Sequence, residues 1–182
     1  MSEIQVASRY AKSLIDLAEE QNALEAVRTD MDLFIRTLRE NPTLKAVLKN
    51  PILGPDKKSG ILTQLFGPRL HPMIMTFFAI VVRKGRSGIL FETAKEFINE
   101  YNIRKNIVKA TVTSAAPLNA ENIKQIEEVI KQATHGEIIL TAKVDPSLIG
   151  GFVLKVGDKQ FDTSISSQLS KLKKEFAQKG VV

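Results

Sequence analysis

The spacing of apolar residues changes near residue 105, and this change constrains the fold more than any other feature of the chain. Before it, apolar residues recur every three or four positions, as on one face of an α-helix. From Ile107 onward, alternating segments rich in valine and threonine lie between helical stretches. The sequence therefore predicts an α+β protein with two domains. An N-terminal six-helix bundle covers residues 1–105, and a small C-terminal α+β domain covers residues 106–182.

Capping residues and prolines set the helix boundaries expected in the bundle. Asn22 is the expected N-cap of the second helix, with Glu25 completing a capping box. Asn41-Pro42 and Gly54-Pro55 place a proline in the first turn of the third and fourth helices. The fifth helix is expected over about residues 70–82, with the sixth soon after it.

The second domain is expected to contain four strands and two helices. The strands fall over residues 107–114, 138–144 and 152–156, with a short fourth strand after a turn at residues 157–159. Asn119 is expected to cap the first helix, and His135-Gly136 to end it. Its inward residues are expected to be Ile123, Ile126, Val129, Ile130 and Ala133. The last helix follows Asp162 and Ser164 and carries the apolar residues Ile165, Leu169, Leu172 and Phe176.

Chemically reactive side chains are few. The chain has no cysteine, which excludes disulfides, thiolate metal sites and thiol nucleophiles. The two histidines, His71 and His135, fall at predicted helix boundaries, which favours a structural role. No metalloprotease, phosphate-loop or hydrolase-elbow motif occurs. Gly150 and Gly151 join two predicted strands, so they are interpreted as a turn that needs a positive φ. We therefore expect no catalytic, metal or cofactor site.

The charge leaves one alternative function open. The net charge is +6 and the pI is about 9.5, which favours acidic partners, so a basic nucleic-acid-binding module is the alternative. Phe34, Phe66, Phe77 and Phe97 lie on predicted apolar helix stripes rather than on an exposed strand among basic residues, which argues against RNA stacking. The cluster Lys171, Lys173, Lys174 and Lys179 is interpreted as a solvated helix face. The longest apolar run is too short to span a membrane, so we expect a soluble chain that is cytoplasmic if bacterial.

Three separated blocks carry a family resemblance. They are ASRYAKSL at residues 7–14, VTSAAPL at residues 112–118, and VDPSLIGGFVLKVGD at residues 144–158 with its continuation over residues 161–172. In this order they resemble the delta subunit of F-type ATP synthases and its mitochondrial counterpart, the oligomycin-sensitivity-conferring protein. The double glycine, followed by a valine-rich strand and Gly-Asp, is the most specific part of the resemblance.

The resemblance implies a non-catalytic stator subunit. In this family the helical domain sits on the catalytic alpha/beta head and grips the N-terminal helix of an alpha subunit. The C-terminal domain holds the end of the b-type stalk subunits, so ion-driven rotation is coupled to ATP synthesis. The resemblance further implies a peripheral position at the cytoplasmic face of the cell (inner) membrane, one copy per complex, a monomer on its own, and no nucleic-acid partner.

Surplus apolar surface indicates where such a grip would lie. The first predicted helix has two neighbouring apolar stripes, and the fifth is apolar nearly all round, whereas a small bundle buries one face of each. We expect the surplus to line a groove for the partner helix between them. The candidate lining residues are Ala7, Tyr10, Ala11, Leu14, Phe77, Ile80 and Val81. The alternative is that each of them is a core residue.

Overall fold

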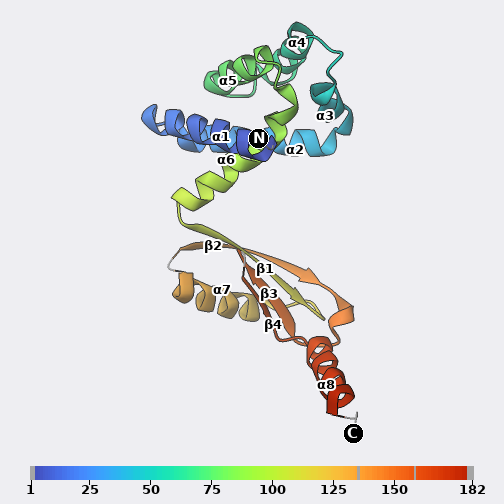
Figure 1. The fold of residues 1–182 in the computed structure, drawn as a ribbon. Helices are drawn as coiled ribbons and strands as arrows, with labels where there is room; N and C mark the ends of the chain where they lie inside the picture. Colours follow the sequence, from blue (N-terminus) through green and yellow to red (C-terminus); the bar gives the residue numbers. More distant parts are fainter. Residues whose placement is uncertain (1–2, 135, 158, 180–182) are drawn as a thin grey trace. The chain divides into compact units, whose positions relative to one another are not determined.

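The computed structural model describes residues 3–134, 136–157 and 159–179 and has the α+β fold that the sequence predicts (Figure 1). The chain divides into two compact units, residues 1–102 and residues 103–182. The boundary falls at residue 102, close to the expected position at residue 105. His135 and Asp158, which belong to two of the predicted turns, lie outside the described residues.

Unit 1 is helical throughout its regular structure. Its elements are α1 (Glu3–Glu20), α2 (Leu24–Glu40), α3 (Pro42–Lys49), α4 (Pro55–Phe66), α5 (Pro72–Arg83), the short 3-10 helix η1 (Ser87–Ile89) and α6 (Leu90–Arg104), whose last two residues belong to unit 2. All six predicted helices are therefore present in the described part of the chain. Prolines occupy the first turns of α3 and α4, as predicted.

Aromatic rings from three helices meet at the centre of unit 1. The ring of Phe34 on α2 lies 5.2 Å from that of Phe66 on α4 and 4.6 Å from that of Phe78 on α5, measured between centroids. All three side chains are at most 2% exposed. Rings at such tilted and edge-on contacts hold their helices at defined distances. This cluster fixes α5 against the rest of the bundle.

The predicted role of Asn22 is wrong. Asn22 has a φ of 53°, and Ala23 rather than Asn22 is the N-cap of α2, without a side-chain capping bond. The Ala23 N–H donates to the Ala18 carbonyl at 2.9 Å. This bond closes the C-terminal end of α1 around Asn22, which takes the left-handed conformation. Asparagine tolerates this conformation better than most residues. Glu25 does not complete a capping box but accepts a hydrogen bond from the Tyr101 hydroxyl on α6.

A buried lysine links α3, α4 and η1. The Lys58 ammonium donates to the Leu48 carbonyl at 3.0 Å and to the Ser87 hydroxyl at 2.9 Å. The Ser87 hydroxyl in turn donates to the same carbonyl at 2.6 Å. A cation at the C-terminal end of α3 is favoured by the helix dipole. The network therefore stabilises the C-terminal end of α3 inside unit 1.

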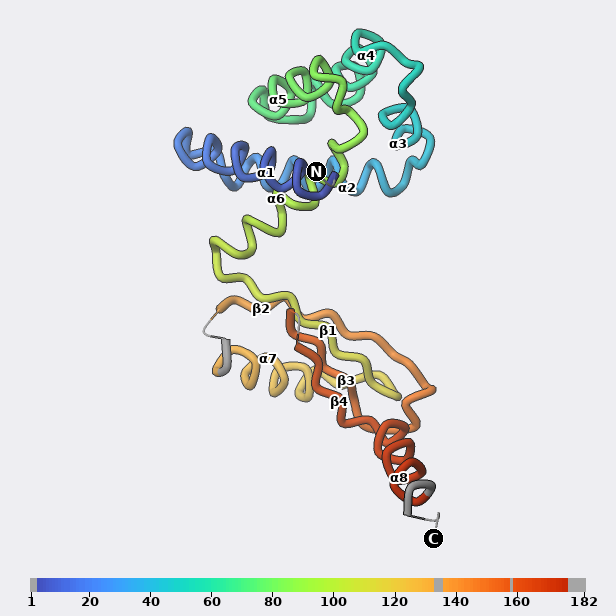
Figure 2. Tube along the Cα trace, in the orientation of Figure 1, coloured from blue at the N-terminus to red at the C-terminus, as the bar shows by residue number. Residues whose placement is uncertain are grey.

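The described residues of unit 2 form a mixed four-stranded sheet with two α-helices. Its elements are β1 (Ile107–Ser114), α7 (Ala120–Thr134), β2 (Glu137–Val144), the 3-10 helix η2 (Pro146–Leu148), β3 (Phe152–Val156), β4 (Lys159–Asp162) and α8 (Ile165–Lys179). The strand order is β2-β1-β3-β4, with β1 parallel to β2 and the other pairs antiparallel. Figure 2 shows α7 crossing from β1 to β2 along one side of the sheet.

Helix α7 covers one face of this sheet. Ala110 and Val112 of β1 and Ile130 of α7 are at most 3% exposed, so they form the core of the unit. Asn119 caps α7 as predicted, because its side-chain oxygen accepts from the Asn122 N–H at 2.7 Å. The inward assignment of Val129 is wrong. It is 65% exposed, since it lies about 100° around the helix from Ile130.

Candidate partner-docking sites

A surface depression of about 350 Å³ lies between α1 and α5 of unit 1. It is lined by Leu17 and Gln21 from α1 and by His71, Pro72, Met73, Thr76, Phe77 and Ile80 from α5 and its cap. Leu17 is 39% exposed and Ile80 is 47% exposed, although both side chains are large and apolar. The depression therefore offers an apolar floor that the described part of unit 1 does not cover.

Two aromatic residues continue this surface toward the other end of α1. The rings of Tyr10 and Phe77 meet edge to face, with centroids 6.1 Å apart. The Arg86 guanidinium donates to the Tyr10 hydroxyl at 3.0 Å. Arg86, just after the end of α5, therefore contacts the first half of α1. At the other end of the surface, Leu17 near the end of α1 lines the depression together with Pro72, the first residue of α5. The two helices therefore run antiparallel along the surface that they share.

The end of this surface near Tyr10 is positively charged. Arg83, Lys84 and Arg86 at the end of α5 are all exposed. Cations at a helix C-terminus are stabilised by the helix dipole, and here they also stand beside an apolar surface. A partner helix with a carboxylate at this end would gain a favourable contact.

The structure corrects four of the seven residues predicted to line the groove. Ala7, Ala11 and Val81 are 0% exposed and Leu14 is 2% exposed, so they are core residues. Tyr10 and Phe77 are half-buried, and Ile80 is exposed. Of the predicted set, only these last three present surface between α1 and α5.

The correction follows from the two stripes on α1. The stripe that contains Ala7 and Ala11 faces the core, where small side chains let neighbouring helices approach. The neighbouring stripe, Val6, Tyr10 and Leu17, is partly exposed. The site prediction included Phe77 and Ile80 but missed the other lining residues, which are Leu17 and Gln21 on α1 and His71, Pro72, Met73 and Thr76 at the start of α5. The signal that would have found Leu17 is its place on this second stripe, seven residues after Tyr10.

In unit 2 the last helix presents an uncovered apolar stripe. The exposed fractions are 43% for Ile165, 45% for Leu169, 47% for Leu172 and 73% for Phe176. Among the described residues, α8 packs mainly against η2. The four residues were predicted as the apolar face of this helix, but the described part of unit 2 supplies no core for them.

Hydrogen bonds to Asp162 fix the start of α8. The Asp162 carboxylate accepts from the Ser167 hydroxyl at 2.6 Å, from the Ser164 hydroxyl at 2.7 Å and from the Ser164 N–H at 2.9 Å. These donors, first Ser167 and then Ser164, hold the pKa of Asp162 below its ordinary value, since they stabilise the ionised form. The Ile165 N–H donates to the Gly150 carbonyl at 3.0 Å. The helix thus begins on a defined loop.

The double glycine supplies that loop. Gly151 has a φ of +72°, the left-handed conformation expected for at least one residue of this turn, whereas Gly150 has no positive φ. A Cβ on Gly151 would collide with the backbone carbonyl of Thr163. A Cβ on Gly150 would lie 2.6 Å from the terminal carbon of Ile165. Both glycines therefore sit against the segment that starts α8.

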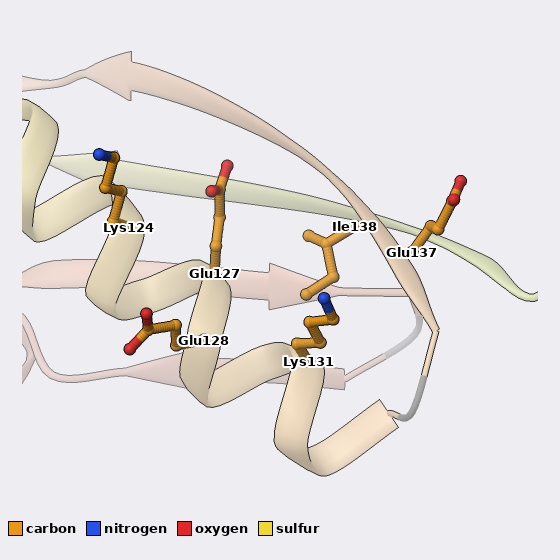
Figure 3. A pocket seen from close by; sticks show the side chains of 6 residues that line it. All are labelled: Lys124, Glu127, Glu128, Lys131, Glu137 and Ile138. Carbon is orange, nitrogen blue, oxygen red and sulfur yellow. The ribbon is translucent and has the colours of Figure 1, made fainter.

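Reactive side chains do not converge in the described residues. A second depression, between α7 and β2, is lined by Lys124, Glu127, Glu128, Lys131, Glu137 and Ile138 (Figure 3). Ile138 points toward α7 and Glu137 points away from it, so the carboxylates do not gather on one centre. Within residues 3–134, 136–157 and 159–179, no three metal-ligating side chains form a cluster. No helix in those ranges is both long and apolar enough to cross a bilayer.

The sheet face opposite α7 carries threonines and lysines together with Ile139 and Val153. Thr111 pairs with Thr141 and Lys155, and its neighbour on the same face, Thr113, pairs with Lys143. The two phenylalanines of the strands fall on the other face, because Phe152 pairs with Ser114 and Phe161 with Leu154. Single-stranded RNA is bound by stacking its bases on exposed aromatic rings of such a sheet. The described part of the open face offers none.

The fold and its surfaces define a class: a two-unit α+β protein whose distinctive surface features are apolar faces suited to helices. Comparison with known proteins is consistent with this class. The sequence matches the ATP synthase delta (OSCP) subunit family over residues 6–176. It is 36% identical over 178 residues to the ATP synthase subunit delta of Cytophaga hutchinsonii, covering 98% of this chain and 97% of that one. It is 37% identical over 177 residues to that of Amoebophilus asiaticus, with 97% and 96% covered.

The similarity extends to a chloroplast protein and to a solved structure. The chloroplastic subunit delta of Emiliania huxleyi is 34% identical over 170 residues, with 93% of this chain and 94% of that one covered. A chain in the cryo-EM structure of the Toxoplasma gondii mitochondrial ATP synthase hexamer has the same fold. Its TM-score is 0.72 at 23% identity, with 94% and 97% covered. The chain belongs to the ATP synthase delta (OSCP) subunit family.

Proposed function

We propose that this chain is a non-catalytic stator subunit of an F-type ATP synthase that links the catalytic alpha/beta head to the peripheral stalk. Unit 1 binds the N-terminal helix of an alpha subunit, and unit 2 holds the end of the b-type stalk subunits. The link keeps the head from turning with the rotor, so that ion-driven rotation is coupled to ATP synthesis. The subunit acts at the cytoplasmic face of the membrane, one copy per complex. Family membership supports this proposal.

The depression between α1 and α5 is the observation that carries the head-binding half of the proposal. Two antiparallel helices with apolar side chains between them form the kind of groove that takes the apolar face of an amphipathic helix. Leu17 and Ile80 would lose their remaining solvent contact on binding, and each half-exposed side chain of this size contributes about 1 kcal/mol when buried. The cations Arg83 and Lys84 would favour a partner with acidic residues at that end.

Calorimetric titration with a synthetic peptide of the alpha-subunit N-terminus, taken from the same genome, tests this half. Ile80→Glu places a carboxylate in the groove, where it is exposed in the free protein but buried without a counter-charge in the complex. We expect it to leave folding intact and to weaken peptide binding at least about a hundredfold. Gln64→Glu, an exposed change on α4 that also lowers the net charge by one, is the matched control.

The possible results separate the alternatives. A folded Ile80→Glu variant that binds the peptide normally would contradict the groove, and a wild-type chain that ignores the peptide would contradict the head-binding role. If the wild-type chain instead bound labelled DNA or RNA with steep salt dependence and no peptide, the nucleic-acid alternative would stand.

A further inference from the structure

The uncovered stripe on α8 has the spacing of a coiled-coil seam. Its residues Ile165, Leu169, Leu172 and Phe176 follow one another at intervals of four, three and four residues. This alternation is that of the a and d positions of a heptad repeat, which pack as knobs into the holes of a facing helix. Over its 15 residues α8 carries two a and two d positions, about three helical turns of seam.

We propose that this seam is the surface through which unit 2 binds the stalk, by taking one amphipathic helix in coiled-coil packing. The inference rests on the proposed function and names the element, the face and the geometry of the contact. The partner helix presents its own apolar residues at intervals of three and four and crosses α8 at about 20°.

Charges beside the seam specify the chemistry of the partner. Lys173 borders the seam on one side and Glu175 borders it on the other, and both are exposed. In coiled coils, residues at these flanking positions select the partner and fix its register through opposite charges. The partner helix therefore carries a carboxylate on the Lys173 side and a cation on the Glu175 side.

The same charges argue against two other occupants. Two copies of α8 packed seam to seam, in either direction, bring no opposite charge to Lys173 or Glu175, because the other flanking residues are Ser166 and Gln168. An anionic lipid surface would attract Lys171, Lys173 and Lys174 but repel Glu175, which borders the apolar stripe that would have to enter the membrane. One helix of mixed charge satisfies both flanks.

The helix is also held in place before any partner binds. Its first turn is fixed by the hydrogen bonds from Ser164 and Ser167 to Asp162 and by the bond from the Ile165 N–H to Gly150. Ser164 is 0% exposed, so this anchor is part of the packed body of unit 2. Pre-formation of a binding surface lowers the entropy lost on association.

The experiment uses the full-length chain and a synthetic peptide that covers the end of the b-type subunit encoded in the same genome. Leu172→Glu puts a carboxylate into the seam, and we expect peptide binding to weaken at least about a hundredfold. Ser170→Glu makes the same change in charge on the opposite side of the same helix, where it is exposed, and binding should change by less than about threefold. Both variants should keep the wild-type circular-dichroism spectrum and bind the alpha-subunit peptide normally.

Each result has one interpretation. Loss of binding in Leu172→Glu with retention in Ser170→Glu supports the seam. If the wild type and Leu172→Glu bind the stalk peptide equally, the seam is wrong while the stalk-binding function stands. If the wild type does not bind the peptide at all, the stalk-binding function itself fails. Two further measurements can overturn the inference: self-association by light scattering and binding to vesicles of anionic phospholipid. The seam would then have a different occupant if Leu172→Glu abolishes either of these while the same variant still binds the stalk peptide as the wild type does.

Discussion

Three glycines of unit 2 allow backbone strain and steric collision to be measured separately. Gly157 has a φ of +57° and open space around the position of a Cβ, so Gly157→Ala meets strain alone. Gly150 has no positive φ, and its Cβ would meet only the flexible end of Ile165. Gly151 combines a φ of +72° with a collision against the Thr163 backbone, which cannot move without shifting the start of α8.

The expected losses of unfolding free energy follow from these differences. A left-handed alanine costs about 1–2 kcal/mol, and the reduced entropy of the unfolded chain offsets about 0.4–1 kcal/mol of this. We therefore expect about 1 kcal/mol for Gly157→Ala and close to zero for Gly150→Ala. The backbone collision adds about 1–3 kcal/mol, which brings Gly151→Ala to about 3 kcal/mol.

Hydrogen exchange of β3 followed by mass spectrometry is the suitable assay. The chain has no tryptophan, and both of its tyrosines, Tyr10 and Tyr101, lie in unit 1, so intrinsic fluorescence does not report on unit 2. At about 1.4 kcal/mol per factor of ten, Gly151→Ala should raise the opening equilibrium of β3 about a hundredfold, and Gly157→Ala about fivefold. Equal effects at Gly150 and Gly151 would refute the reasoning, because they would mean that neither φ nor the Thr163 contact matters.

Two further predictions concern a buried face and a titrating carboxylate. Ala11→Asp should unfold unit 1, because Ala11 is 0% exposed and an unpaired carboxylate in the core costs several kcal/mol, whereas the exposed Ser13→Asp on the same helix should keep the wild-type melt by circular dichroism. If Ala11→Asp melted at the wild-type temperature, Ala11 would not be a core residue. Hydrogen bonds from Ser167 and Ser164 depress the pKa of Asp162 in the folded protein. The ionised carboxylate therefore contributes its full stability above the ordinary carboxyl pKa, and this contribution is lost as the pH falls through the lower pKa of the folded state. Asp162→Asn should therefore speed exchange in α8 at pH 7 more than at pH 3, and an equal effect at both values would contradict this origin.

The sequence by itself determined the kind and order of the elements. The helical spacing up to about residue 105 and the alternation after it report local preferences, and β1 begins and ends at the predicted residues 107 and 114. Prolines mark the starts of α3 and α4 because proline fits only the first turn of a helix. The turn at Gly151 was also predictable from the local sequence, because glycine adopts a positive φ more readily than other residues.

Only the tertiary structure decided which apolar faces are covered. On α1, both stripes are apolar, and the rotation that turns Ala11 inward and leaves Leu17 at the surface is set by packing against neighbouring helices rather than by α1 itself. On α8, the pattern of Leu169 and Leu172 is that of an ordinary core-facing helix, yet both side chains are exposed and the residues that the structure describes in unit 2 form no layer over them. Helical periodicity encodes that a face is apolar but not what lies against it, because burial depends on residues distant in the sequence.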